Sequence, residues 1–196
     1  PSVTLTWTQV ASAGDELTAG LDFRQDGATF PFGAHVSIVE VDTETGHVRP
    51  LRHVAVDDCG RVLNPLIVAG QQHGGAVQGM SQALWEEFVY DDEGTPLTST
   101  FADYAIPTAA DAIALEVSNT DTPTPLNPLG AKGIGESATI GATPAVQNAV
   151  VDAVRHLGVR HVDLPCTPLR VWQAISAAQA GPVDPWREPP AVFRTL

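Results

Sequence analysis

Residues 34–56 read AHVSIVEVDTETGHVRPLRHVAV. Apolar and polar side chains alternate over residues 34–41, and residues 48–56 form a second run rich in apolar side chains. Between them the sequence DTETG, at residues 42–46, has the composition of a turn, so the stretch predicts a β-hairpin. Both predicted strands carry long apolar side chains, which a sheet buries against a second layer. We therefore expect helices to cover one face of the hairpin.

Three later segments begin with the same helix-start signal, a small polar residue followed by proline. The polar side chain accepts hydrogen bonds from backbone N–H groups of the first turn. Proline fits the first helical position, because the backbone N–H that it lacks has no acceptor within the helix at that position. The predicted helices span residues 65–88 after Asn64, 144–157 after Thr143, and 168–175 after Thr167. Gly158 is placed to end the second helix.

Shorter elements complete the expected fold. Ser2–Val10 and Ala114–Ser118 each predict a strand, and residues 119–137 predict a long loop because they hold three prolines and three glycines without a period. Strands followed by helices without regular alternation indicate the α+β class. We expect a mixed sheet and hairpin packed on three main helices, forming one domain over residues 1–180 with a proline-rich tail at residues 181–196.

The composition narrows the possible functions. A formal net charge of −13 argues against nucleic acid or an anionic membrane as a partner. No apolar run approaches the roughly 18–20 residues of a transmembrane helix, and the first residues do not resemble a signal peptide. Cys59 and Cys166 lie in no metal-binding spacing, so we expect no metal ligand and no iron–sulfur cluster held by this chain alone. Two reduced cysteines favour a cytoplasmic protein.

The helix predicted at residues 65–88 has two different faces. At about 100° per residue, one face carries Gln71, Gly75, Gln78 and Gln82. The opposite face carries Val77, Met80, Leu84 and Phe88 and is expected to enter the core. Glycine inside a helix costs about 0.5–1 kcal/mol relative to alanine, so the glycines at 70, 74, 75 and 79 need a reason. Close approach by another backbone and binding of a bulky polar ligand both remain open.

Residues 128–138 read PLGAKGIGESA, a glycine-rich loop with one carboxylate. Gly133, Gly135 and Ala138 fit a dinucleotide-binding string, but no strand precedes it and Asp152, the acid at the right distance, lies within a predicted helix. The lysine is not followed by serine or threonine, which excludes a Walker loop. Two interpretations of Glu136 remain open. It is either a helix-capping or surface residue, or a catalytic group on a tightly folding loop.

Four segments together resemble one protein family. They read DDCGRVLNP at residues 57–65, GQQHGGAVQG at 70–79, LWEE at 84–87 and AKGIGE at 131–136. Their order and spacing are similar to the C-terminal portion of the molybdenum-binding large subunit of the xanthine dehydrogenase, aldehyde oxidase and aerobic CO dehydrogenase family, the molybdenum hydroxylases. Residues 137–146 and 161–168 are most similar to the large subunits of bacterial CO dehydrogenase-like enzymes. The resemblance extends over residues 29–175.

The resemblance implies a molybdenum-dependent oxidoreductase that works in a complex of several chains. It implies that Glu136 faces the molybdenum as the catalytic base and that Gln71 hydrogen-bonds the cofactor. The residues it implies for cofactor binding are Gln71, Gly74, Gly75, Gln78, Lys132, Gly133, Ile134 and Gly135. The expected cofactor is molybdopterin with molybdenum, in its cytosine dinucleotide form, with iron–sulfur clusters and FAD on partner chains.

The family's large subunit is several times longer than this chain. We therefore expect hetero-oligomeric partners: the remaining molybdenum-binding chain, an iron–sulfur subunit and an FAD subunit, acting on a small-molecule substrate. His73 departs from the family pattern, because many relatives carry an acid there. The alternative is a non-catalytic assembly or scaffold subunit that keeps the fold without metal. A hydrolase using Glu136 with a histidine finds no supporting nucleophile or metal motif.

Overall fold

A computed structural model of the chain describes residues 3–13, 20–24 and 26–181. Its centre is a three-stranded sheet of order β1-β2-β3, formed by β1 (Phe32–Val41), β2 (Val48–Asp58) and β3 (Leu115–Thr120). β1 and β2 pair as an antiparallel hairpin, whereas β2 and β3 run parallel. Parallel neighbours need a crossover, and α2 (Pro65–Leu84) lies in that connection. The predicted hairpin and the mixed α+β class are confirmed.

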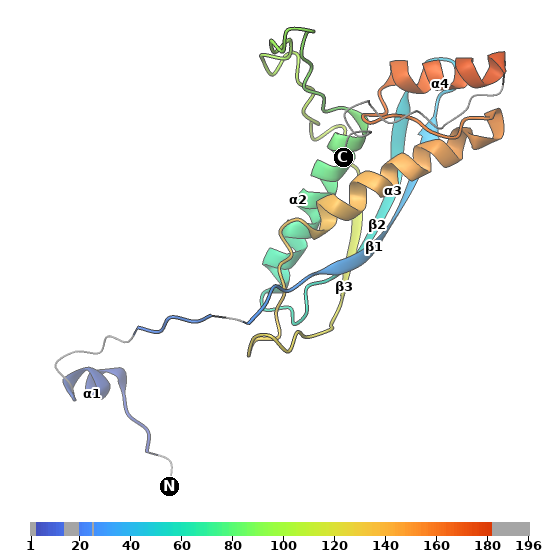
Figure 1. Ribbon diagram of the computed structural model, residues 1–196. Coiled ribbons are helices and arrows are strands. Elements are labelled where there is room, and N and C mark those ends of the chain that lie inside the picture. Colours follow the sequence, from blue (N-terminus) through green and yellow to red (C-terminus); the bar gives the residue numbers. More distant parts are fainter. Residues whose placement is uncertain (1–2, 14–19, 25, 182–196) are drawn as a thin grey trace.

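Helices cover one face of the sheet, as the hairpin sequence predicts. Figure 1 shows α2 and α3 (Ser137–Val154) crossing on that face, with α4 (Pro168–Ala180) at the far end of the hairpin. A short 3-10 turn, η1 (Arg155–Leu157), follows α3, and Gly158 closes it in the left-handed conformation expected of a terminating glycine. The main core lies between these layers and combines aliphatic side chains of β2, α2, α3 and α4, including Val48, Met80, Leu84, Val146, Val150, Val154, Val171 and Ile175.

Small residues bring α2 and α3 into close contact. A Cβ built at Gly79 would lie 2.8 Å from the Ala142 Cβ and 2.8 Å from the Thr139 carbonyl oxygen. A Cβ at Gly75 would lie 3.1 Å from the Ala138 Cβ. The Thr139 and Thr143 hydroxyls lie 3.1 and 3.2 Å from the carbonyl oxygens of Gly75 and Gly79. Backbone approach therefore explains these two glycines, whereas nothing lies within 4 Å of a Cβ at Gly70 or Gly74.

Two helix predictions hold at their starts, and one is wrong. Asn64 caps α2 and Thr167 caps α4, each followed by proline at the first helical position. α3, however, begins at Ser137, so Thr143 does not cap it and Pro144 lies inside the helix. Pro144 removes one helical hydrogen bond, that to the Ile140 carbonyl. Ile140 and Pro144 are both exposed, so water donates to the Ile140 carbonyl in place of the missing N–H.

Other boundaries also shift. α2 ends at Leu84, so Phe88 is not on the helix and is exposed. β3 runs to Thr120, which shortens the predicted loop at its start. The predicted strand at Ser2–Val10 is wrong over the described residues, because Trp7–Ser12 form helix α1. Thr6 and Gln9 make a capping box there, a local signal that outweighs the weak alternation. Residues 182–196 of the predicted tail lie outside the described residues, so the division into domain and tail stays a prediction.

The second face of the sheet has no helix over it within the described part of the chain. Phe32, Val36 and Ile38 alternate along β1 on this face and are 55%, 61% and 48% exposed. Arg52 of β2 and Glu116 of β3 form a bidentate ion pair beside them. A sheet normally buries an apolar face of this kind, so we name these three β1 residues the open sheet face.

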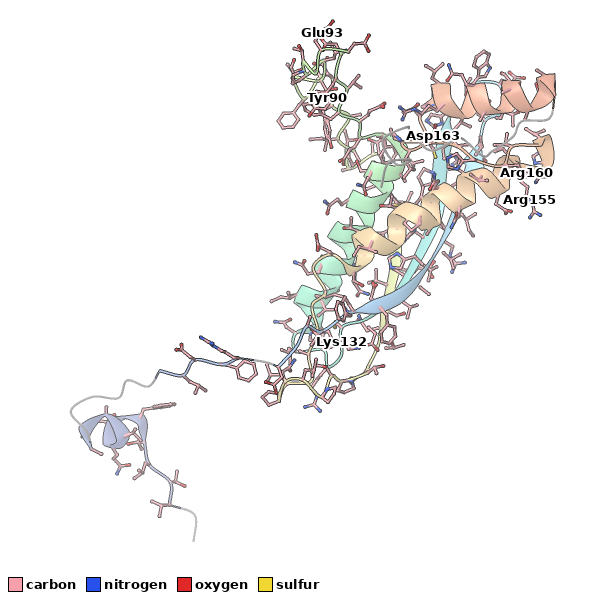
Figure 2. All side chains as sticks on the ribbon, in the orientation of Figure 1. Tyr90, Glu93, Lys132, Arg155, Arg160 and Asp163 are labelled. Atoms are coloured by element: carbon pink, nitrogen blue, oxygen red, sulfur yellow. The ribbon has the colours of Figure 1, made fainter. Side chains whose placement is uncertain are left out.

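The segment that connects α2 to β3 projects from the body. Figure 1 shows it leaving the C-terminal end of α2, and Figure 2 places Tyr90 and Glu93 on it. Phe88 and Tyr90 pack with ring centroids 5.0 Å apart, and a hollow beside them is lined by Phe101 and Tyr104. None of the described helices is long and apolar enough to cross a membrane.

The close contact of α2 with α3 predicts opposite effects for two glycine substitutions. Gly79→Ala should lower the free energy of unfolding by about 1–3 kcal/mol, because the new methyl group overlaps α3. Gly70→Ala should raise it by about 0.5–1 kcal/mol, since the methyl meets open space and alanine favours the helix. Urea unfolding of the chain measures both. Equal effects of the two variants would contradict this account of the helix contact.

Candidate functional site

Most of the residues predicted from the sequence to bind a cofactor or to act in catalysis lie at one end of the sheet. β2 and β3 both end there, and α2 and α3 both begin there (Figure 1). The glycine-rich loop passes across this end, and Figure 2 shows Lys132 on it, far from Arg155 and Arg160 at the opposite end of α3. The carboxyl ends of adjacent parallel strands are a common place for ligand sites, because loops and helix N-termini meet there.

Two adjacent carboxylates end β2 and are both fully buried, Asp57 at 1% and Asp58 at 0% exposure. Consecutive strand residues point to opposite faces of a sheet, so the two side chains face different layers. Asp58 accepts hydrogen bonds from the Gly60 amide at 2.9 Å, the Thr120 hydroxyl at 2.8 Å and the Lys132 ammonium at 3.0 Å. Burial alone would raise the pKa of Asp58, but hydrogen bonds, including one from Thr122, hold it well below its usual value.

Asp57 faces the helices. Its Oδ1 accepts from His35 Nε2 at 3.3 Å and from the Ser137 hydroxyl, and its Oδ2 accepts from Gln72 Nε2 at 3.0 Å. Gln72 also donates to the Ser118 carbonyl at 3.0 Å, so both neighbours are acceptors and the amide orientation is fixed. Burial opposes ionisation of Asp57, yet the hydrogen bonds from His35, Ser137 and Gln72 outweigh it and lower the pKa.

A chain of polar side chains extends from Asp57 under α3. His35 Nδ1 lies 3.2 Å from His53 Nε2, and His53 Nδ1 lies 2.6 Å from the Ser37 hydroxyl. All three contacts become hydrogen bonds when each imidazole carries a proton on Nε2 and accepts at Nδ1. Burial, with a smaller effect of His35, lowers the pKa of His53 to about 4, which agrees with a neutral ring.

The glycine-rich loop is fixed at its start and open in its middle. The Lys132 amide donates to the Cys59 carbonyl at 2.7 Å, and Gly60 pairs with Ala131. The next four backbone amides, at residues 133–136, have no hydrogen-bond acceptor within the described chain. Glu136 is exposed at the N-cap position of α3, but its side chain makes no hydrogen bond to the helix, so it does not cap α3 through its carboxylate and the interpretation as a surface residue stays open.

Gln71 is the glutamine that lies against this loop. Its Oε1 is 3.6 Å from a Cβ built at Gly135, and Gly135 precedes Glu136. Gln78 and Gln82 lie farther along α2, where their Oε1 atoms are 3.2 and 3.0 Å from the hydroxyls of Thr139 and Thr143. The structure therefore brings Gln71, Gly135 and Glu136 together and leaves Gln78 at the α2–α3 contact.

The other residues predicted to bind a cofactor fall into two groups. Gly74 and Gly133 face open space, since nothing lies within 4 Å of a Cβ at either. Gly75 packs on α3, and the Lys132 ammonium is held by Asp58 and lies 4.5 Å from the centre of the Phe32 ring. Ile134 is partly buried within the loop. Cofactor binding by each of these residues stays a prediction.

The buried residues behind the loop were not assigned a role from the sequence. Gln72 and Ser137 contact Asp57 across 15 and 80 positions of the chain, so no local period connects them. The pair Asp57-Asp58 at the end of an apolar strand was the available signal, because buried carboxylates require donors. Within the described residues, no three His, Cys, Asp or Glu side chains are grouped as metal ligands.

This chain resembles known proteins in sequence and fold. The sequence model of the molybdopterin cofactor-binding domain matches residues 2–113, more than half of the chain. The chain belongs to the molybdopterin cofactor-binding domain family. This match ends at residue 113, before the glycine-rich loop, so the family model does not cover residues 130–137.

Relatives of this family extend the likeness through the loop and α3. The carbon monoxide dehydrogenase large chain of Hydrogenophaga pseudoflava is 42% identical over 147 residues, 75% of this chain and 18% of that one. The nicotine 6-hydroxylase large subunit of Paenarthrobacter nicotinovorans is 40% identical over 175 residues, 86% of this chain and 21% of that one. The solved CO dehydrogenase from Oligotropha carboxidovorans matches with a TM-score of 0.74 and 39% identity, covering 78% of this chain and 19% of that one.

The chain thus spans about a fifth of the length of the curated relatives it matches. The resemblance to molybdenum hydroxylase large subunits stated from the sequence is confirmed by these matches.

The buried histidine chain predicts how stability depends on pH. The pKa of His53 falls from 6.5 to about 4 on folding. Between these two pH values His53 is protonated in the unfolded chain and neutral in the folded chain. The stability from this group is complete above pH 6.5 and is lost as the pH falls toward 4, by at most about 1.4 kcal/mol per pH unit.

Unfolding free energies measured between these pH values test this directly. His53→Gln should show a shallower loss than the parent chain, because glutamine does not titrate. The loss from Asp57, whose pKa is also lowered, sets in at more acid pH and serves as an internal reference. Parallel curves for the two proteins would show that His53 is not neutral in the fold.

Proposed function

We propose that this chain is the C-terminal part of the large subunit of a molybdenum hydroxylase, in which it binds a molybdopterin cofactor and supplies Glu136 as the active-site base. The observation that carries the proposal is the exposed Glu136 carboxylate on a loop of unpaired backbone amides, with Gln71 beside it. Because residues 133, 135 and 136 are exposed, these amides are accessible to a ligand that carries acceptor oxygens.

The donors at this end fit an oxygen-rich, anionic cofactor. Consecutive backbone N–H groups before a helix N-terminus attract phosphate and similar groups, because their dipoles point outward. The amides at residues 133–136 meet this description, and α3 begins directly behind them. Gln71 adds a side chain that both donates and accepts, as the edge of a pterin requires. The cytosine dinucleotide form of molybdopterin, with its two phosphates, matches this donor set.

The glycines without close neighbours support the same assignment. Gly74 on α2 and Gly133 on the loop both face open space, so the packing of this chain does not require the missing side chains. Gly74 lies one helical turn from Gln71 on α2, and Gly133 lies two residues before Gly135, so both open positions belong to the proposed site. We propose cofactor contacts for Gln71, Gly74, Gly75, Gln78, Lys132 and the loop Gly133–Gly135. Of these, Gly75, Gln78 and Lys132 also contact other parts of this chain.

The bound molybdenum cofactor would supply two-electron oxidation of a small substrate. Glu136 takes a proton during that oxidation, which requires its carboxylate within about 2.6–3.2 Å of the proton donor. The nearby carboxylates of Asp57 and Asp58 are buried and fully engaged with donors, so they are not available for this task. The exposed carboxylate of Glu136 is free to turn toward the substrate.

The substrate is selected outside this chain. Two relatives at 42% and 40% identity are named for carbon monoxide and for nicotine, although they share this segment. Because enzymes named for such different substrates share this segment, we infer that it serves the reaction they have in common and not the choice of substrate. In the assembled enzyme, an iron–sulfur subunit and an FAD subunit receive the electrons.

The remaining part of the molybdenum-binding subunit is the partner that covers the open sheet face. Phe32, Val36 and Ile38 present apolar area that a folded domain normally buries. About four fifths of the length of the curated relatives lies outside the segment matched by this chain. A cytoplasmic location agrees with an enzyme that exchanges electrons with flavin.

The catalytic assignment predicts a selective loss on one substitution. In the assembled enzyme, Glu136→Gln should lower turnover by at least about 10²-fold, the usual contribution of a general base. Folding and cofactor content should stay near normal, because the amide has the same shape and makes no contact that folding needs. Steady-state kinetics and molybdenum analysis of the purified complex measure the two quantities.

Glu93→Gln is the matched control, since Glu93 is exposed on the projecting segment remote from the loop (Figure 2). It should leave turnover unchanged. Full turnover of Glu136→Gln with normal metal content would end the catalytic assignment and favour the alternative of a scaffold subunit.

A further inference from the structure

The loop that carries Glu136 is held at both of its ends by the adjacent carboxylates of β2. Asp58 binds the Lys132 ammonium on one face of the sheet, and Asp57 binds the Ser137 hydroxyl on the other. Between these two attachments lie residues 133–136, whose backbone amides have no acceptor in the described chain. A loop with few contacts of its own has its position determined by its attached ends.

The attachment at Ser137 is next to Glu136. The Glu136 carbonyl accepts from the Ile140 amide at 3.0 Å, so Glu136 belongs to the first turn of α3. Its own side chain makes no hydrogen bond that would fix this turn. The hydrogen bond that the Ser137 hydroxyl donates to Asp57 fixes this turn by attaching it to β2.

The same helix face makes a second contact with the network. A Cβ at Gly141, one turn after Ser137, would lie 2.7 Å from Cδ2 of the His35 ring. α3 thus rests on His35 and Asp57 through two positions of one face. His35 in turn donates to Asp57, and Gln72 donates to it from α2. Three elements, β1, α2 and α3, converge on this one carboxylate.

We propose that Asp57 is a positioning residue for the reaction: it orients Glu136 by holding Ser137 at the first turn of α3. This inference rests on the proposed function, because it assigns the network to the alignment of the catalytic base. The buried histidine pair keeps the Asp57 carboxylate from turning, since His35 is itself held by His53 and Ser37. Catalysis tolerates little misplacement, because a shift of about 1 Å at a reacting group can cost about 10²-fold in rate.

Ser137→Ala in the assembled enzyme isolates this contact, because it removes one hydroxyl and keeps Asp57 with its donors His35 and Gln72. We expect kcat to fall between about tenfold and 10²-fold, with KM and molybdenum content unchanged. Ser137→Thr restores the hydroxyl and should recover most of the rate. Thr143→Val is the matched control on α3, since its hydroxyl contacts Gly79 and Gln82 and not Asp57. It should keep the parent kcat.

Two further measurements separate positioning from a general loss of structure. In a Glu136→Gln background, Ser137→Ala should cause no additional loss of the residual rate, because Ser137 acts through Glu136. In the full chain without its partners, hydrogen exchange of the Ile140 amide should be faster in Ser137→Ala than in Thr143→Val.

The outcomes distinguish this proposal from the proposed function. Inactive Glu136→Gln with full kcat in Ser137→Ala would overturn the positioning role and leave the catalytic base in place. Equal losses from Ser137→Ala in both backgrounds would also overturn it, because they indicate a structural effect alone. Full activity of Glu136→Gln would overturn the base assignment and with it the role of Asp57.

Discussion

Two buried carboxylates at the end of β2 constrain much of this structure. An ionised carboxylate without donors is too costly to bury, so Asp57 and Asp58 require partners from whatever surrounds them. Because the strand turns them to opposite faces, the donors come from different elements, Lys132 on one side and His35, Gln72 and Ser137 on the other. One dipeptide thereby fixes the glycine-rich loop to the sheet and α3 to α2.

Most of the interior is closed, although Gln72 Oε1 and Ser81 Oγ are buried without a hydrogen-bond partner among the described residues, while one end and one face of the chain stay open. The helix layer is closed by aliphatic packing and by the glycine contacts between α2 and α3. The amides at residues 133–136 have no acceptor within the described chain, the positions at Gly74 and Gly133 face open space, and Val36 and Ile38 of the open sheet face are exposed. On a chain of this family, these exposed groups are where the proposed cofactor and the rest of the proposed larger subunit would bind.

Sequence patterns predicted the parts of this fold that local chemistry determines. The hairpin followed from alternation and a turn, and α2 and α4 followed from their caps and prolines. Pro144 gave the same signal as a helix start, but the contacts of Ser137 with β2 extend α3 by two turns before it. The helical period grouped Gln71 with Gln78 and Gln82 but assigned no role to Gln72, which is buried against Asp57. Contacts between residues far apart in the chain have no period, which is why the supporting network needed the structure.

The central claim is that this chain contributes one part of a molybdenum site that other chains complete. Metal analysis of the purified chain, alone and after assembly with the remaining molybdenum-binding part, tests it most directly. The account predicts no stoichiometric molybdenum in the chain alone, because residues 133–136 and Gln71 would line only one side of the proposed cofactor site. It predicts stoichiometric molybdenum in the complex. Stoichiometric molybdenum in the chain alone, or none in the assembled complex, would contradict it.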